Sequence, residues 1–125
     1  MSATTNVPLS GQHLWDSLME MARIGGTAKG GCNRQTLTDL DGEGRHLLRR
    51  WAEAAGCTLS VDRVGNMMLT RPGRDPARKP VAFGSHLDTQ PTGGKFDGRS
   101  ACSRASRSCA RCMRPASRPR RRSCS

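Results

Sequence analysis

The stretch Val81-Ala82-Phe83-Gly84-Ser85-His86-Leu87-Asp88-Thr89 decides the fold class of this 125-residue chain. Its first five residues are apolar or small, which is typical of a short strand buried on both faces of an α/β sheet. Polar side chains follow at once. Positions just beyond the carboxyl end of a strand face the ligand crevice in α/β proteins. The stretch therefore predicts a β-strand over 81–85 and a functional site directly after it.

Two helices are predicted upstream of this strand. Apolar residues at helical spacing predict a first helix over 12–24, with Ser10 as its N-cap. The same spacing predicts a second helix over 42–55, capped by Asp39 or Asp41.

A hairpin and a surface connection are predicted between the second helix and the strand. The period changes to two, so that 58–62 and 67–70 predict paired strands that turn at Val64-Gly65-Asn66. The segment 71–80 is rich in proline, glycine and charge, which predicts a surface connection. The order helix, helix, hairpin, strand indicates the beginning of an α/β domain.

The net charge of +11 is concentrated at the C-terminal end of the chain. Residues 1–98 hold 12 Lys and Arg against 10 Asp and Glu, which leaves +2, whereas residues 99–125 hold 9 Arg and no acid. The second segment also contains no Leu, Ile, Val or Phe. Such a segment cannot bury enough apolar surface to offset the entropy of ordering it. We therefore predict a globular part over 1–98 and a disordered basic tail over 99–125.

The composition argues against membrane and secreted proteins. No apolar run approaches the ~20 residues of a membrane span. The first ten residues lack the basic and apolar regions of a secretory signal. We expect a cytoplasmic protein with no membrane partner, and six cysteines that form no disulfide framework in a reducing compartment.

The polar residues after the predicted strand suit a metal site. His86 offers an imidazole nitrogen, and Asp88, two residues on, can hydrogen-bond the other ring nitrogen and fix the tautomer. Asp97 adds a hard oxygen ligand, and its glycine neighbours allow a close backbone approach. A single His-x-Asp also occurs as a plain surface pair, so the short motif alone leaves that alternative open.

The longer string GSHLDTQPTGGKFDG, residues 84–98, is more specific. It resembles the metal-binding segment of the M20-type metallopeptidase superfamily, and within it the N-carbamoyl-L-amino-acid hydrolases, the β-ureidopropionases and the allantoate amidohydrolases. The resemblance covers residues 12–98 and includes Gly30-Gly31, Leu37-Thr38-Asp39, the helix end over 51–56 and Gly65-Asn66.

This resemblance implies the incomplete N-terminal part of a metal-dependent amidohydrolase with an α/β catalytic domain. It implies two divalent metal ions (Zn²⁺, or Mn²⁺, Co²⁺ or Ni²⁺), with His86 as a ligand of one ion and Asp97 as the bridging carboxylate. Asp88 is implied as the catalytic-site acid that supports His86. The implied substrate is an N-carbamoyl amino acid or another ureido compound such as allantoate, and the implied full-length assembly is a homodimer.

The family pattern stops at Gly98. The family's general base, its remaining metal ligands and its dimerisation domain lie further along the chain than this point. Each metal ion needs about three protein ligands and an open position, so two ligands cannot close the site. We therefore expect this chain to retain no metal pair and to lack hydrolase activity. Apolar faces left without their partners predict poor solubility.

The tail over 99–125 is interpreted as a product of a reading-frame change. With GC-rich codons and one C restored after the codon of Gly98, the segment reads PVGVLAGLEVLRAMHEAGIPTAPPLVLV. The regrouped peptide has apolar residues at helical spacing, ends its helix in glycine and closes on a buried-strand pattern. Ser and Arg have six codons each, so the genetic code permits this interpretation without forcing it.

The alternative is a small basic protein that binds polyanions. Nine arginines bind polyanions at low salt by charge alone. The tail has no aromatic residue to stack on bases, so we expect no specific nucleic-acid partner. Its cysteines form one Cys-x-x-Cys pair without the second pair of a zinc knuckle: Cys102, Cys109, Cys112 and Cys124.

The remaining notable residues have ordinary structural interpretations. We expect surface positions for His13 and His46, and plain thiols at Cys32 and Cys57. Trp15 and Trp51 are predicted to anchor the core. Asn33, Arg34 and Thr38 lie in a polar loop that approaches the substrate in related enzymes. We assign no individual role to any of the three.

Overall fold

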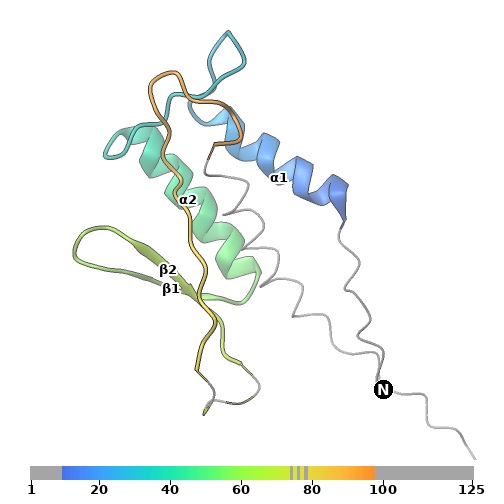
Figure 1. The fold of residues 1–125 in the computed structure, drawn as a ribbon, viewed down its shortest axis with the longest axis vertical. Coiled ribbons are helices and arrows are strands. Elements are labelled where there is room, and N and C mark those ends of the chain that lie inside the picture. The colour runs from blue at the N-terminus through green and yellow to red at the C-terminus, as the bar shows by residue number, and fades with distance from the viewer. Residues whose placement is uncertain (1–9, 74, 76, 78, 98–125) are drawn as a thin grey trace, which may run out of the picture.

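The chain folds as two helices followed by a hairpin (Figure 1). A computed structural model describes residues 10–73, 75, 77 and 79–97. Helix α1 spans Gly11–Arg23 and helix α2 spans Asp39–Ala54. Strand β1 spans Thr58–Val61 and strand β2 spans Met67–Thr70. Both predicted helices and the predicted hairpin are confirmed, with bounds close to those expected.

The two helices begin at capping side chains. The Ser10 hydroxyl accepts a hydrogen bond from the backbone N–H of His13 at 3.3 Å, as predicted for α1. The N-cap of α2 is Thr38, so the predicted cap at Asp39 or Asp41 was wrong. The Thr38 hydroxyl accepts from the Asp41 N–H at 3.3 Å, and both aspartates lie in the first turn. There they face the positive end of the helix dipole.

The hairpin is antiparallel and closed by an aspartate. Thr58 lies opposite Thr70, and Val61 lies opposite Met67. Between the strands, the Asp62 carboxylate accepts from the backbone N–H groups of residues 64 and 66 at 3.0 and 2.8 Å. This side chain organises the predicted turn, because it replaces ladder partners that the turn residues lack.

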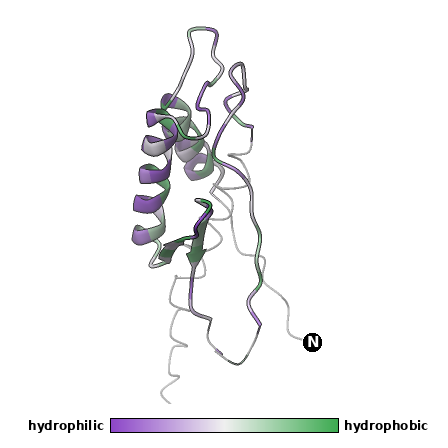
Figure 2. Ribbon diagram, turned by 90° about the vertical axis from the view of Figure 1, so that its left-hand side faces the viewer, coloured by the Kyte–Doolittle hydropathy of each residue, from purple (hydrophilic) through white to green (hydrophobic). Residues whose placement is uncertain are grey.

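The predicted strand over 81–85 is wrong for this chain. Residues 79–90 contain no helix or strand, and within the described part β1 and β2 pair only with each other. Val81 is 90% exposed and Phe83 is 59% exposed, and Figure 2 shows a hydrophobic stretch in this segment. A strand buried on both faces needs neighbouring strands, and the described residues provide none for it.

The core is small and divided. One cluster contains Ala52, Ala55 and Cys57, with Leu69 of β2 packed against it. The other buried apolar side chains are Cys32, in the loop between the helices, and four residues of the helices themselves: Leu18, Met21, Leu47 and Leu48. At Gly44 of α2, an added Cβ would lie 3.0 Å from Cδ and Nε of Arg34 and 3.6 Å from the sulfur of Met21, so these two side chains pack against α2 there.

The tryptophans differ from the prediction, whereas the histidines and cysteines agree with it. Trp15 is 52% exposed, so its predicted core role is wrong; its ring lies 5.8 Å from that of Phe96, which is also exposed. Trp51 is half-buried, and its indole N–H donates to Glu20 at 3.3 Å. The two helix histidines are exposed, and Cys32 and Cys57 are buried thiols that form no disulfide within the described residues.

The predictions for the tail over 99–125, including its disorder and its four cysteines, lie outside the described residues, as does Gly98. In the part of the chain that is described, no helix has the length and apolar character needed to cross a membrane.

Candidate functional site

His86, Asp88 and Thr36 form a hydrogen-bonded chain. The Nδ1 atom of His86 lies 3.1 Å from Oδ1 of Asp88 and 3.0 Å from the backbone oxygen of the same residue. The Thr36 hydroxyl donates to the other carboxylate oxygen, Oδ2, at 2.8 Å. Two acceptors at Nδ1 assign a ring proton to that nitrogen, so Nε2 is the nitrogen that would bind a metal ion. This is the tautomer that a carboxylate-supported metal ligand requires.

The carboxyl of Asp88 is ionised at neutral pH. The hydrogen bond from the Thr36 hydroxyl lowers the pKa of Asp88, partial burial opposes this effect, and His86 lowers the pKa further. An ionised carboxylate is the better acceptor for the ring N–H. The spacing therefore gives the contact expected from the sequence, while the role of His86 as a metal ligand stays a prediction.

Asp97 lies in a separate loop. Its residue is exposed, and its backbone N–H donates to the oxygen of Gly94 at 3.3 Å. The loop is attached to the body of the protein because the Cys32 N–H donates to the Gly93 oxygen at 2.8 Å. Among residues 10–73, 75, 77 and 79–97, no three His, Cys, Asp or Glu side chains gather as a metal-ligand group. The bridging role of Asp97 stays a prediction.

These donors fit part of a metal centre. His86 has the tautomer and the supporting carboxylate of a metal ligand. A closed site needs about three protein ligands for each ion, and the described residues bring together fewer than three. The described part of this chain thus does not form a complete two-metal centre.

Arg34 also joins this segment to the rest of the fold. It is completely buried, and its guanidinium donates to the backbone oxygen of Leu87, between the two predicted site residues. Its backbone also pairs with Thr89 in both directions. The sequence gives Arg34 no individual role in its polar loop, because no local pattern reveals that two of its partners, Leu87 and Thr89, lie more than 50 positions away.

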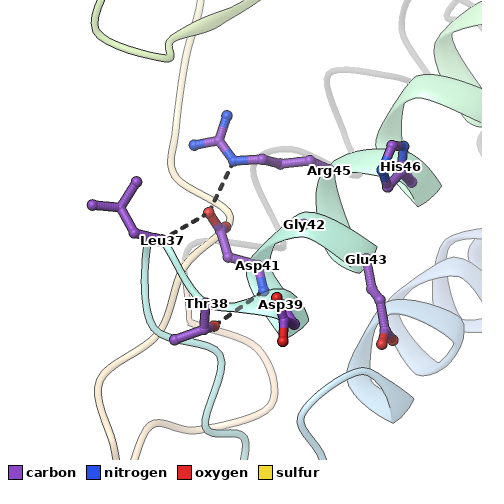
Figure 3. Close-up of a pocket in the computed structure, with 8 residues that line it drawn as sticks. All are labelled: Leu37, Thr38, Asp39, Asp41, Gly42, Glu43, Arg45 and His46. Carbon is purple, nitrogen blue, oxygen red and sulfur yellow. Dashed lines mark hydrogen bonds and ion pairs between the residues drawn. The ribbon is translucent and has the colours of Figure 1, made fainter.

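A hollow lies at the beginning of α2 (Figure 3). The Asp41 carboxylate lines this hollow. It accepts a hydrogen bond from the Leu37 N–H at 3.4 Å and another from Nε of Arg45 at 2.9 Å. The lining residues are Leu37, Thr38, Asp39, Asp41, Gly42, Glu43, Arg45 and His46. None of the predicted site residues is among them, so we assign this hollow no function.

Known proteins resemble the chain over part of their length. No family model matches it. An N-carbamoyl-L-amino-acid amidohydrolase from Rhizobium meliloti is 63% identical over 93 residues, which are 74% of this chain and 22% of that protein. An allantoate deiminase from Glycine max is 32% identical over 81 residues, or 65% of this chain and 17% of that protein.

The fold comparison agrees with the sequence comparison. The crystal structure of a hydantoinase/carbamoylase family amidase from Burkholderia multivorans matches with a TM-score of 0.80 and 50% identity, over 83% of this chain and 25% of that one. The chain thus spans between 17% and 25% of the length of these relatives, and its helices and small sheet are part of an α/β domain. By sequence and by fold, the chain is similar to an N-terminal part of the N-carbamoyl-L-amino-acid amidohydrolases and hydantoinase/carbamoylase amidases, as its motif predicted.

Proposed function

We propose that the chain corresponds to the N-terminal part of a metal-dependent hydrolase that cleaves the carbamoyl C–N bond of N-carbamoyl-L-amino acids. The reaction consumes one water and releases the amino acid, ammonia and CO₂. The observation that carries the proposal is the 63% identity to a protein named for this activity. The His86–Asp88 contact at 3.1 Å adds support, because it prepares an imidazole to bind a metal ion.

In the complete enzyme, this part of the chain would supply His86 as a metal ligand and Asp97 as a bridging carboxylate. Two divalent ions, Zn²⁺ or Mn²⁺, Co²⁺ or Ni²⁺, would lower the pKa of a bound water and polarise the ureido carbonyl. Asp88 would hold the His86 ring and its proton on Nδ1, and Thr36 would hold Asp88. We propose a cytoplasmic homodimer for the complete enzyme, with no specific nucleic-acid or membrane partner.

The 125-residue chain by itself is proposed to be inactive, because its described residues supply too few ligands for a metal pair. The test is to incubate the purified chain with an N-carbamoyl-L-amino acid and Mn²⁺ or Zn²⁺, and to measure ammonia release. We expect no turnover above the metal-only control. Release that the variant His86→Ala abolishes would contradict the proposed inactivity.

The gene provides the test of the parent activity. Sequencing downstream of the Gly98 codon is expected to reveal a long open frame after restoration of one base. The protein from that frame is expected to hydrolyse N-carbamoyl-L-amino acids, and His86→Ala in the same frame serves as the matched control. If no single-base change opens such a frame, the proposed frame change is wrong.

Allantoate is the competing substrate. One relative is named allantoate deiminase, but its identity to the chain is 32% against 63% for the carbamoyl amino-acid enzyme. Offering both substrates to the restored protein distinguishes the two activities. We expect the N-carbamoyl amino acid to have the higher kcat/KM, and the opposite order would replace the proposed substrate.

A further inference from the structure

Arg34 is a buried cation that is held by backbone carbonyl groups. Its residue is 0% exposed, and no carboxylate pairs with it among the described residues. Its Nη1 atom donates to the backbone oxygens of Met21 and Ile24 at 3.2 and 2.8 Å, and Nη2 donates to that of Leu87 at 2.5 Å. Its Nε atom is buried without a hydrogen-bond partner. Burial of a charge is costly unless its donors are satisfied, so these carbonyls determine where the side chain lies.

The carbonyls come from two distant parts of the chain. Met21 and Ile24 lie at the C-terminal end of α1, where the helix dipole is negative and favours a cation. Leu87 lies between His86 and Asp88. The planar guanidinium presents its donors in a fixed fork, so one side chain sets the relative position of both segments. A lysine ammonium lacks this fork.

The backbone next to the guanidinium extends the same junction. The Arg34 N–H donates to the Thr89 hydroxyl at 2.8 Å, and the Thr89 N–H donates to the Arg34 oxygen at 2.8 Å. The Thr89 hydroxyl in turn donates to the oxygen of Cys32 at 3.2 Å. Residues 79–86 are exposed, and the junction attaches the following segment to the body of the protein together with the Thr36–Asp88 and Cys32–Gly93 hydrogen bonds.

We propose that Arg34 is a positioning residue for His86 and Asp88. By fixing the Leu87 carbonyl between them, it holds the two side chains where the Asp88 carboxylate meets Nδ1 of the ring. The inference deepens the proposed function, because it concerns the residues assigned to that site. Its test is made on the metal-free chain and measures ring geometry, so it is independent of any hydrolase activity.

The experiment compares the full chain with three variants by NMR. Arg34→Met removes the donors, Arg34→Lys keeps the charge without the fork, and Arg45→Met is the matched control. Arg45 also binds a backbone oxygen, that of Gly65 at 2.7 Å, but lies in a different part of the fold. Ring nitrogen chemical shifts report the His86 tautomer, and exposed His13 and His46 are internal references. Amide exchange at Thr89 and Cys57 reports local and general opening.

Arg34→Met is expected to shift the His86 ring signals to those of the two reference histidines. It should also speed amide exchange at Thr89 by roughly tenfold to a hundredfold, as expected for the loss of hydrogen bonds to a charged group. Exchange at Cys57, whose N–H donates to Ala52 at 2.9 Å, should change much less. Arg34→Lys should not restore the His86 signals, and Arg45→Met should leave them as in the parent.

Two results would overturn the inference. The first is an unchanged His86 tautomer in a folded Arg34→Met chain. The second is an equal change in Arg45→Met, which would reveal general destabilisation. If Arg34→Met does not fold, Arg34→Lys decides: this change keeps the charge and the apolar stem but removes the fork that holds the Leu87 carbonyl. A His86 signal that moves toward the reference histidines supports the inference, and a parent-like signal contradicts it.

Discussion

Gly25→Ala should destabilise the protein substantially more than Gly30→Ala, although the two glycines have the same backbone conformation. Both have a φ of +78°, in the left-handed region that disfavours residues with a Cβ. A Cβ at Gly25 would lie 2.5 Å from the oxygen and 3.0 Å from the carbonyl carbon of Asn33, whereas nothing lies within 4 Å of a Cβ at Gly30. Gly30→Ala is therefore a control for the backbone conformation alone.

The expected magnitudes follow from these two terms. A left-handed non-glycine residue costs about 1–2 kcal/mol, which both variants share. At Gly25 the Asn33 backbone must also move away, which weakens the hydrogen bond from the Asn33 N–H to the Gly25 oxygen, now 2.7 Å. Loss of such a bond costs about 0.5–1.5 kcal/mol. Local repacking around Arg34, whose Cβ lies 3.2 Å from the added atom, increases the difference.

Urea unfolding followed by circular dichroism measures the free energy of unfolding of each variant. We expect the same dependence of this free energy on urea concentration in both variants. We expect Gly25→Ala to lose about 1 kcal/mol or more beyond Gly30→Ala. Free energies of unfolding that agree to within about 0.5 kcal/mol between the two variants would refute the predicted clash at Gly25. A difference of that size is typical of surface substitutions that disturb no specific contact.

Three further predictions concern the helix cap, the hairpin and the exposed segment. Thr38→Ala should lower the free energy of unfolding by about 1 kcal/mol, measured by urea titration, because it removes the N-cap of α2. Hydrogen bonds from Asn66 lower the pKa of Asp62 from 3.8; its stabilisation of the hairpin should therefore be complete above pH 3.8 and lost as the pH falls through the lowered pKa. Asp62→Asn should abolish that pH dependence in NMR spectra of the hairpin. Phe83→Lys should raise the concentration at which the chain precipitates, measured by light scattering, because Phe83 is an exposed apolar side chain.

Local patterns were sufficient to predict the helices and the hairpin. The apolar spacing of α1 and α2 and the alternation around residues 58–70 depend on neighbours in the sequence, and the structure confirms them. The cap of α2 was missed because Asp39 and Asp41 compete with Thr38 as capping residues, and only the backbone geometry decides among them. The prediction of a strand over 81–85 was wrong for another reason. A buried strand needs neighbouring strands, and no local sequence pattern shows whether they are present.

The contacts of the candidate site likewise include a local one, which the sequence predicts, and distant ones, which it does not. The contact between His86 and Asp88 follows from their spacing of two, so the sequence was sufficient to predict it. The hydroxyl of Thr36 and the guanidinium of Arg34 reach the segment from more than 50 positions away. These two contacts depend on where the fold places residues 87 and 88 relative to the loop that follows α1, and neither composition nor periodicity predicts that placement.

The junction around Arg34 has a consequence for how the chain folds. Its hydrogen bonds connect residues that are 53, 55 and 57 positions apart, whereas both helices lie within the first 54 residues. Contacts of such separation form late, because the loop between them must close first. During synthesis on a ribosome, both helices can emerge and form while the guanidinium of Arg34 is still hydrated. We therefore expect the helices to reach their final packing only after the segment bearing His86 has been synthesised, in the same folding event that assembles the site segment.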